Sequence, residues 1–191
     1  GLSQEEFNIA KTIHAKMIER EKQTVPPVEH KGKRYVGRIL RIDDPLHITI
    51  GNITTCCQRL GQGQPGESSM IHSANEENGS VFVVEEVDEY GNTVKVVAQS
   101  WTWRNGDRVC FDNVEIPNTV AGELSSNGGY DEIYGIYTSV AQKMIDIDKK
   151  ALGRLLDEGK ITREQYEALV IKEVTVGSGC DDLLHNVSEE V

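Results

Sequence analysis

The chain has 191 residues, 38% of them hydrophobic and 27% charged, which is ordinary for one globular α/β domain. Its formal net charge of −11 argues against general nucleic-acid binding, and no apolar run is long enough to span a membrane. The four cysteines follow no disulfide framework and no metal-ligand spacing, so we expect reduced thiols, no metal site and a cytoplasmic location.

The first predicted element is a helix over residues 3–22. Ser3 and Glu6 can form a capping box, and apolar residues then recur at helical spacing. Two consecutive prolines follow, which cannot continue a helix and therefore predict an extended linker. We expect residues 1–30 to form this helix and linker, and residues 31–191 to form a single domain.

Two short strands are predicted next, at residues 35–42 and 46–50, with an Asp-Asp-Pro turn between them. Residues 52–60 then fit one or two helical turns, which carry Cys56 and Cys57. A glycine-rich segment comes after them and predicts a flexible loop.

Three consecutive strands, at residues 80–87, 93–104 and 108–116, form the strongest pattern in the chain. Asn105-Gly106 is typical of a two-residue hairpin turn, so these strands should pair in antiparallel fashion. Apolar side chains occur at both odd and even positions, which predicts helices on both faces of the sheet. The expected fold class is therefore α/β (α+β), with a mainly antiparallel sheet between helices.

A polar loop with three glycines is predicted over residues 117–129, followed by a long helix over residues 130–149. A helical hairpin should come next, near residues 150–170, and a last strand at residues 173–176. A glycine-bearing loop before a helix start exposes backbone amides that can hold a phosphate group.

Three segments carry a family resemblance: Ile-Gly-Asn-Ile-Thr-Thr-Cys-Cys-Gln at residues 50–58, Val-Ala-Gln-Ser-Trp-Thr-Trp-Arg at residues 97–104 and Cys-Phe-Asp-Asn-Val-Glu at residues 110–115. With the order of strands, loop, helix and strand, they resemble a GNAT-like acyltransferase-fold family of phage and mobile-element proteins. The resemblance covers roughly residues 36–180 and implies a mixed sheet. It also implies acetyl-CoA as acyl donor and an amine, of a small molecule or a peptide, as acceptor.

The resemblance implies roles for individual residues. The attacking amine needs a base, for which Glu115 is the candidate, and the leaving thiolate needs an acid, for which Tyr134 or Tyr137 is placed early in the helix. The residues expected to hold the cofactor are Gly128, Gly129, Tyr130, Ile116 and Asn118. The residues expected to line the substrate cleft are Gln99, Trp101, Trp103, Asp112 and Asn113. Asp112 should point away from Glu115, because their positions on one strand differ by three, an odd number.

Two other functions fit the same sequence. In a cysteine-dependent hydrolase or transferase, Cys57 beside Cys56 would be the nucleophile and His72 the base, oriented by Asp112 or Asn113. Alternatively, the chain is a non-catalytic GNAT-like module that binds a partner through the helical hairpin. The loop at residues 117–129 lacks the Arg or Gln that a GNAT phosphate loop usually carries, and this departure keeps the last alternative open.

Overall fold

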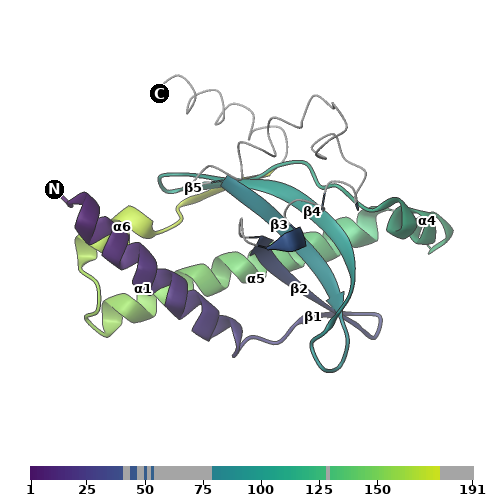
Figure 1. The fold of residues 1–191 in the computed structure, drawn as a ribbon, viewed down its shortest axis with the longest axis horizontal. Coiled ribbons are helices and arrows are strands. Elements are labelled where there is room, and N and C mark those ends of the chain that lie inside the picture. The colour runs from purple at the N-terminus through teal and green to yellow at the C-terminus, as the bar shows by residue number, and fades with distance from the viewer. Residues whose placement is uncertain (41–43, 47–49, 51–52, 54–78, 128–129, 177–191) are drawn as a thin grey trace, which may run out of the picture.

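A six-stranded curled sheet forms the centre of the protein, with its strands in the spatial order of the chain (Figure 1). The computed structural model describes residues 1–40, 44–46, 50, 53, 79–127 and 130–176. The strands are β1 (Val28–His30), β2 (Lys33–Leu40), β3 (Gly79–Val87), β4 (Thr93–Asn105), β5 (Arg108–Phe111) and β6 (Glu173–Val176). All neighbours pair in antiparallel fashion except β5 and β6, which are parallel. The expected mixed, mainly antiparallel sheet is therefore confirmed.

The ribbon of β3, β4 and β5 matches the strongest sequence pattern. Its second turn consists of Gly106 and Asp107, one residue later than the predicted Asn105-Gly106, because Asn105 pairs with Arg108. Gly106 has a φ of 58°, the left-handed conformation that a hairpin turn of this length requires. The first turn is closed by Asp88, whose carboxylate accepts hydrogen bonds from the Tyr90 and Asn92 amides at 2.9 and 2.8 Å. Local turn chemistry thus sets the register of this ribbon.

Four named helices accompany the sheet: α1 (Gln4–Lys22), α4 (Asn118–Asn127), α5 (Tyr130–Asp157) and α6 (Arg163–Leu169). Ser3 and Glu6 form the predicted capping box of α1, and Thr162 with Gln165 forms another at α6. In the ranges that are described, no helix combines the length and the apolar character needed to cross a bilayer.

Two predicted elements are wrong. The polar loop predicted over residues 117–129 is helical from Asn118 to Asn127, because Val120 is buried in the core and packing outweighs weak local propensity. The short strand predicted at residues 46–50 is also wrong, since Leu46 and Ile50 both have helical conformation. Their apolar pattern is too short to separate a strand from a buried helical turn.

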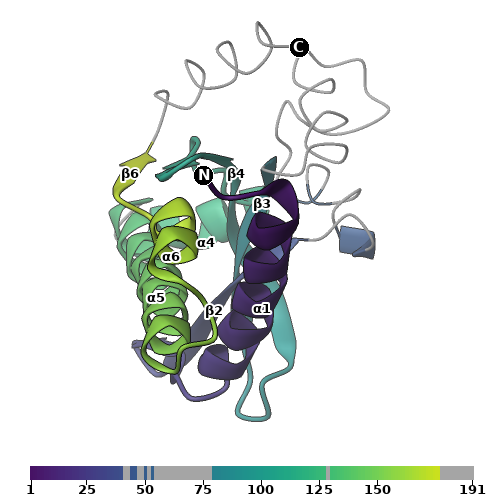
Figure 2. The same ribbon diagram turned by 90° about the vertical axis from the view of Figure 1, so that its left-hand side faces the viewer.

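Helix α5 crosses one face of the sheet, and the two bury the largest apolar cluster between them (Figures 1 and 2). Phe82, Phe111 and Tyr137 meet there edge to face, with ring centroids 5.4 to 6.4 Å apart. Gly37 of β2 lets the helix approach closely. A Cβ atom at this position would lie 2.6 Å from Val140 Cγ1 and 2.7 Å from Phe82 Cε2.

Gly37→Ala should therefore destabilise the fold by about 2 kcal/mol, because neither the fully buried Phe82 nor the helix can yield without repacking. Urea unfolding followed by circular dichroism measures the change. Gly122→Ala is the matched control, since nothing lies within 4 Å of a Cβ atom there. An equal midpoint for Gly37→Ala and Gly122→Ala would contradict the close approach.

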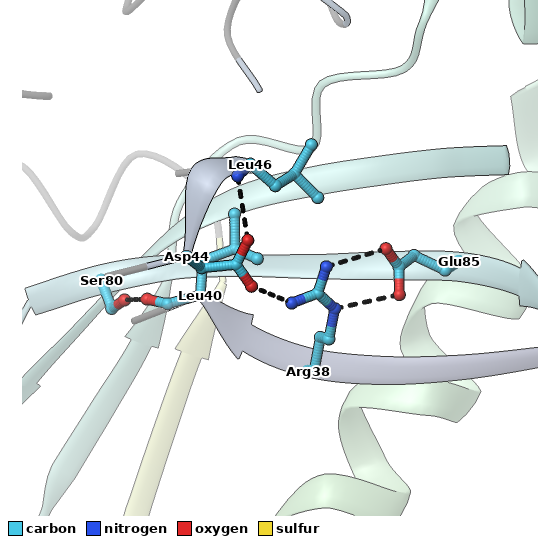
Figure 3. A network of polar contacts seen from close by, with 6 residues as sticks. All are labelled: Arg38, Leu40, Asp44, Leu46, Ser80 and Glu85. Atoms are coloured by element: carbon cyan, nitrogen blue, oxygen red, sulfur yellow. Dashed lines mark hydrogen bonds and ion pairs between the residues drawn. The ribbon is translucent and has the colours of Figure 1, made fainter. Parts of the chain in front are cut away.

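The second face of the sheet carries its own cluster, in which Leu46 and Ile50 pack against Leu40, Val81, Val83 and Trp101. Helical residues thus contact both faces, as expected from the apolar side chains on each. An ion pair between the half-buried Arg38 and the buried Glu85 lies beside this cluster: the Arg38 guanidinium donates to both oxygens of Glu85, from Nε at 3.0 Å and from Nη2 at 3.2 Å (Figure 3). Its third nitrogen, Nη1, donates to Asp44.

A third cluster joins α1 to α5 and α6. Ala10 and Met17 of α1 pack against Leu152, Leu155 and Leu169 of α5 and α6 (Figure 2). The buried Glu21 also ties α1 to α5, since it pairs with Lys150 Nζ at 3.1 Å and Arg154 Nε at 2.9 Å. The predicted division into residues 1–30 and residues 31–191 stays a prediction.

The cysteines depart from expectation at one position. Cys110, fully buried in β5, is disulfide-bonded, so the prediction that all four thiols are reduced is wrong.

Candidate active site between strands β5 and β6

A cavity of about 430 Å³ opens between β5, β6 and α5, beside the carboxyl ends of the two parallel strands. Ligands of α/β proteins commonly bind at such a place, because diverging strand ends leave a crevice. Three of the four elements of the resemblance, namely the last ribbon strand, the long helix and the final strand, meet at this cavity. Its lining residues are Phe111, Asp112, Asn113, Val114, Tyr134, Tyr137, Thr138, Ala141, Gln142, Ile145, Val174 and Val176.

A β-bulge forms one wall of the cavity. Thr102 pairs with Phe111, whereas Gln99 pairs with Glu115, so three steps along β4 correspond to four along the other strand. Asp112 N donates to Trp101 O at 2.7 Å before the bulge, and Glu115 N donates to Gln99 O at 2.8 Å after it. A bulge of this type leaves one residue outside the ladder.

The amide groups inside the bulge differ in their partners. Asn113 N donates to the Asp112 carboxylate at 2.7 Å. Val114 N has no hydrogen-bond partner among the residues that the structure describes. Val114 is also one of the residues that line the cavity.

Tyr137 lies at the centre of the opposite wall, on α5. Its ring is 3% exposed, and its hydroxyl shares a 2.5 Å hydrogen bond with Ser100 Oγ of β4. Burial raises the pKa of Tyr137 to about 12, the Ser100 hydrogen bond opposes this rise and the Asp112 charge adds to it. The phenol is therefore protonated and held in one orientation at neutral pH.

Glu115 lies on the other side of the same strand segment. Val114 and Ile116 pack against the α5-side core, so the intervening Glu115 points to the second face of the sheet. Burial, and then the charge of Asp112, raise the pKa of the Glu115 carboxyl above its ordinary value. The charge of Asp112 thus raises the pKa of both Glu115 and Tyr137. The bulge interrupts the strict alternation from which opposite faces were predicted for Asp112 and Glu115.

The residues predicted for the substrate cleft divide into two groups. Asp112 and Asn113 line the cavity together with Tyr137. Gln99, Trp101 and Trp103 do not: they are buried along β4, and the two indoles meet edge to face with centroids 6.2 Å apart. Trp101 belongs to the second-face cluster, so this group forms a wall behind Glu115 rather than the cavity lining.

None of the described residues that were predicted to hold the cofactor lines this cavity. Ile116 packs against the core, Asn118 begins α4, and Tyr130 is half-exposed at the first residue of α5. Gly128 and Gly129 lie outside the described residues, as do the predicted nucleophile Cys57 and its partner His72.

Other residues of the site were missed by sequence reasoning. Ser100, which bonds Tyr137, was not predicted as a site residue. Strand alternation could have found it, because it places Ser100 on the face of β4 opposite to Gln99 and Trp101, toward the helix. Thr138 and Gln142 of α5 and Val174 and Val176 of β6 also line the cavity. Nothing in the sequence signals which strand β6 would pair with.

No family model and no curated protein matches this sequence. In the described part of the chain, no group of His, Cys, Asp and Glu side chains could hold a metal ion. The GNAT-like resemblance therefore stays a hypothesis.

Proposed function

We propose that this protein transfers an acyl group from an acyl thioester, such as acetyl-CoA, to an amine. The observation that carries the proposal is the cavity at the carboxyl ends of β5 and β6, with a bulge in its wall and acid and base candidates on the two sides of that bulge. The donor would occupy the cavity on the α5 side. Glu115 does not line this cavity but lies on the second face of the sheet, from which the amine would approach.

Glu115 supplies the base in this proposal. An amine attacks only in its neutral form, so a group near it must remove the ammonium proton. A carboxylate with a raised pKa is a stronger base than an ordinary surface glutamate, and the neighbouring Asp112 carboxylate attracts the incoming cation. The proton of the ammonium passes to Glu115 as the nitrogen–carbon bond forms.

Tyr137 and Val114 are expected to donate hydrogen bonds to the acyl thioester. With a pKa of about 12 against about 8.5 for an ordinary thiol, the phenol stabilises a leaving thiolate by donating a hydrogen bond, and full proton transfer would be uphill. The amide of Val114, a residue that lines the same cavity, would donate to the thioester carbonyl oxygen as negative charge develops on it.

The nucleotide end of coenzyme A has a poorer fit to the described residues. The first turn of α5, where the resemblance would place the pyrophosphate, carries the acidic residues Asp131 and Glu132. Acidic side chains stabilise a helix N-terminus but repel a second anion there. We therefore assign no role to the pyrophosphate, and the acyl-pantetheine part of the donor is the part that the cavity suits.

An assay of thiol release tests the proposal. Acetyl-CoA and the truncated donor acetyl-pantetheine are each incubated with a polyamine and with lysine-containing peptides. We expect amine-dependent thiol release from both donors, with kcat/KM values within about tenfold of each other, since the lost contacts are worth little. Tyr137→Phe should lower the rate, whereas Tyr166→Phe on α6 should not.

Two results would contradict the proposal. Thiol release at a rate that does not depend on the amine would indicate thioester hydrolysis rather than acyl transfer. No release with any amine would favour the other GNAT-like hypothesis, a non-catalytic interaction module.

A further inference from the structure

A second cavity, of about 370 Å³, lies on the other flank of α5 and shares no lining residue with the candidate active site. It is formed by the turn between β1 and β2, by β2 and β4, and by the facing ends of α4 and α5. Val97, Val120, Ile133 and Ile136 make an apolar floor, and charged side chains surround it. An apolar floor with a polar rim is the usual form of a small-molecule site.

The acidic groups of this rim are already neutralised. Glu132 accepts from His30 Nε2 at 2.6 Å and from Lys31 Nζ at 2.9 Å. Glu123 accepts from Lys95 Nζ at 2.8 Å. The hydrogen bonds from Lys31 and His30 hold the pKa of Glu132 below its ordinary value, and the one from Lys95 does the same for the pKa of Glu123.

Two other groups retain donors for a ligand. Tyr35 is 6% exposed and lines the cavity, yet its hydroxyl has no hydrogen bond within the described ranges. Lys33 lies two residues earlier on the same face of β2, and its ammonium is 3.8 Å from Glu86 Oε2, beyond hydrogen-bond distance. Glu86 Oε2 also lies 3.8 Å from Lys95 Nζ, so it accepts a hydrogen bond from neither Lys33 nor Lys95.

We propose that this cavity binds a small carboxylate with an apolar body, its carboxylate held by Lys33 Nζ and the Tyr35 hydroxyl. Burial, together with the charges of Glu86, Glu132 and Glu123, raises the pKa of Tyr35, so the phenol keeps the proton that it donates. Glu86 Oε2 is buried and accepts no hydrogen bond among the described residues, so its charge beside the two donors disfavours a multiply charged anion such as a phosphate ester. A monocarboxylate with a short hydrocarbon chain matches both the donors and the floor.

Calorimetric titration of the intact protein tests the ligand class. Hexanoate is the probe, and hexanol and hexylamine are its neutral and cationic counterparts of similar length. We expect hexanoate to bind in the millimolar range or tighter, and both counterparts to bind at least about tenfold more weakly, the value of one hydrogen bond to a charged group. Absence of hexanoate binding at millimolar concentration, or equal binding of hexanol or hexylamine, would overturn the proposal.

Two variants locate the site. Tyr35→Phe should weaken hexanoate binding about tenfold or more, and Lys33→Gln should weaken it severalfold, with the melting temperature as a check on folding. The matched controls are Tyr90→Phe, at an exposed turn, and Lys172→Gln, before β6. Unchanged affinity in Tyr35→Phe would place the carboxylate elsewhere and refute this assignment, whatever the outcome of the acyl-transfer assay.

Discussion

Replacing Arg38 with leucine is expected to lower the free energy of unfolding by about 3 kcal/mol, the low end of the cost of breaking a buried ion pair. Glu85 is 3% exposed, and Arg38 donates to both of its oxygens (Figure 3). Without the guanidinium, the Glu85 charge would stay buried between β2 and β4 with no counter-charge. The lost contact to Asp44 adds a smaller amount, because that side chain is closer to solvent.

Chemical unfolding of three variants measures this effect. Arg34→Leu on the same strand is the control: Arg34 is exposed, and its Nε lies 3.6 Å from the exposed Glu29, so its loss should cost less than about 1 kcal/mol. The double variant Arg38→Leu/Glu85→Leu should recover most of the stability, since an apolar pair needs no compensation. If Arg38→Leu costs no more than Arg34→Leu, the ion pair contributes nothing to the fold.

Replacing Glu115 with glutamine should lower kcat/KM for amine acylation about a thousandfold, within the range for loss of a general base. The amide keeps the size and polarity of the side chain but cannot accept the ammonium proton. Glu89→Gln, in the exposed turn between β3 and β4, should leave kcat/KM unchanged.

The pH profile separates this role from a structural one. In the wild type, kcat/KM should rise with pH through the pKa of Glu115, which burial and Asp112 place above the ordinary glutamate value, because only the carboxylate is a base. Glu115→Gln should lose this acid limb of the profile. A variant that keeps the limb, or keeps wild-type kcat/KM, would exclude Glu115 as the base.

Much of the fold follows from local sequence signals. The faces of β3 are those predicted, with Phe82 and Val84 toward α5 and Val81 and Val83 on the second face, because strand alternation is strict there. The hairpin turn at Gly106 and the caps at Ser3 and Thr162 depend only on neighbouring residues. Such features need no knowledge of distant contacts.

The candidate site depends on distant contacts and was therefore only partly predicted. Tyr137 and Asp112 were found because their chemistry singled them out, but the hydrogen bond from Tyr137 to Ser100 joins residues 37 positions apart. The bulge beside Val114 breaks an alternation that the sequence itself leaves uninterrupted. Parallel pairing of β6 with β5 is set by the path of α5, which no short pattern encodes.

The packing of α1 has a consequence for how the protein is synthesised. Helix α1 is synthesised before α5 and α6, yet it buries Ala10 and Met17 against Leu152, Leu155 and Leu169 of those two helices. Because synthesis proceeds at about 5–20 residues per second, the apolar stripe of α1 stays without these packing partners for many seconds. A nascent chain arrested before α6 should therefore recruit holdase chaperones through α1, while the β3–β5 ribbon, whose contacts lie close in sequence, is already complete.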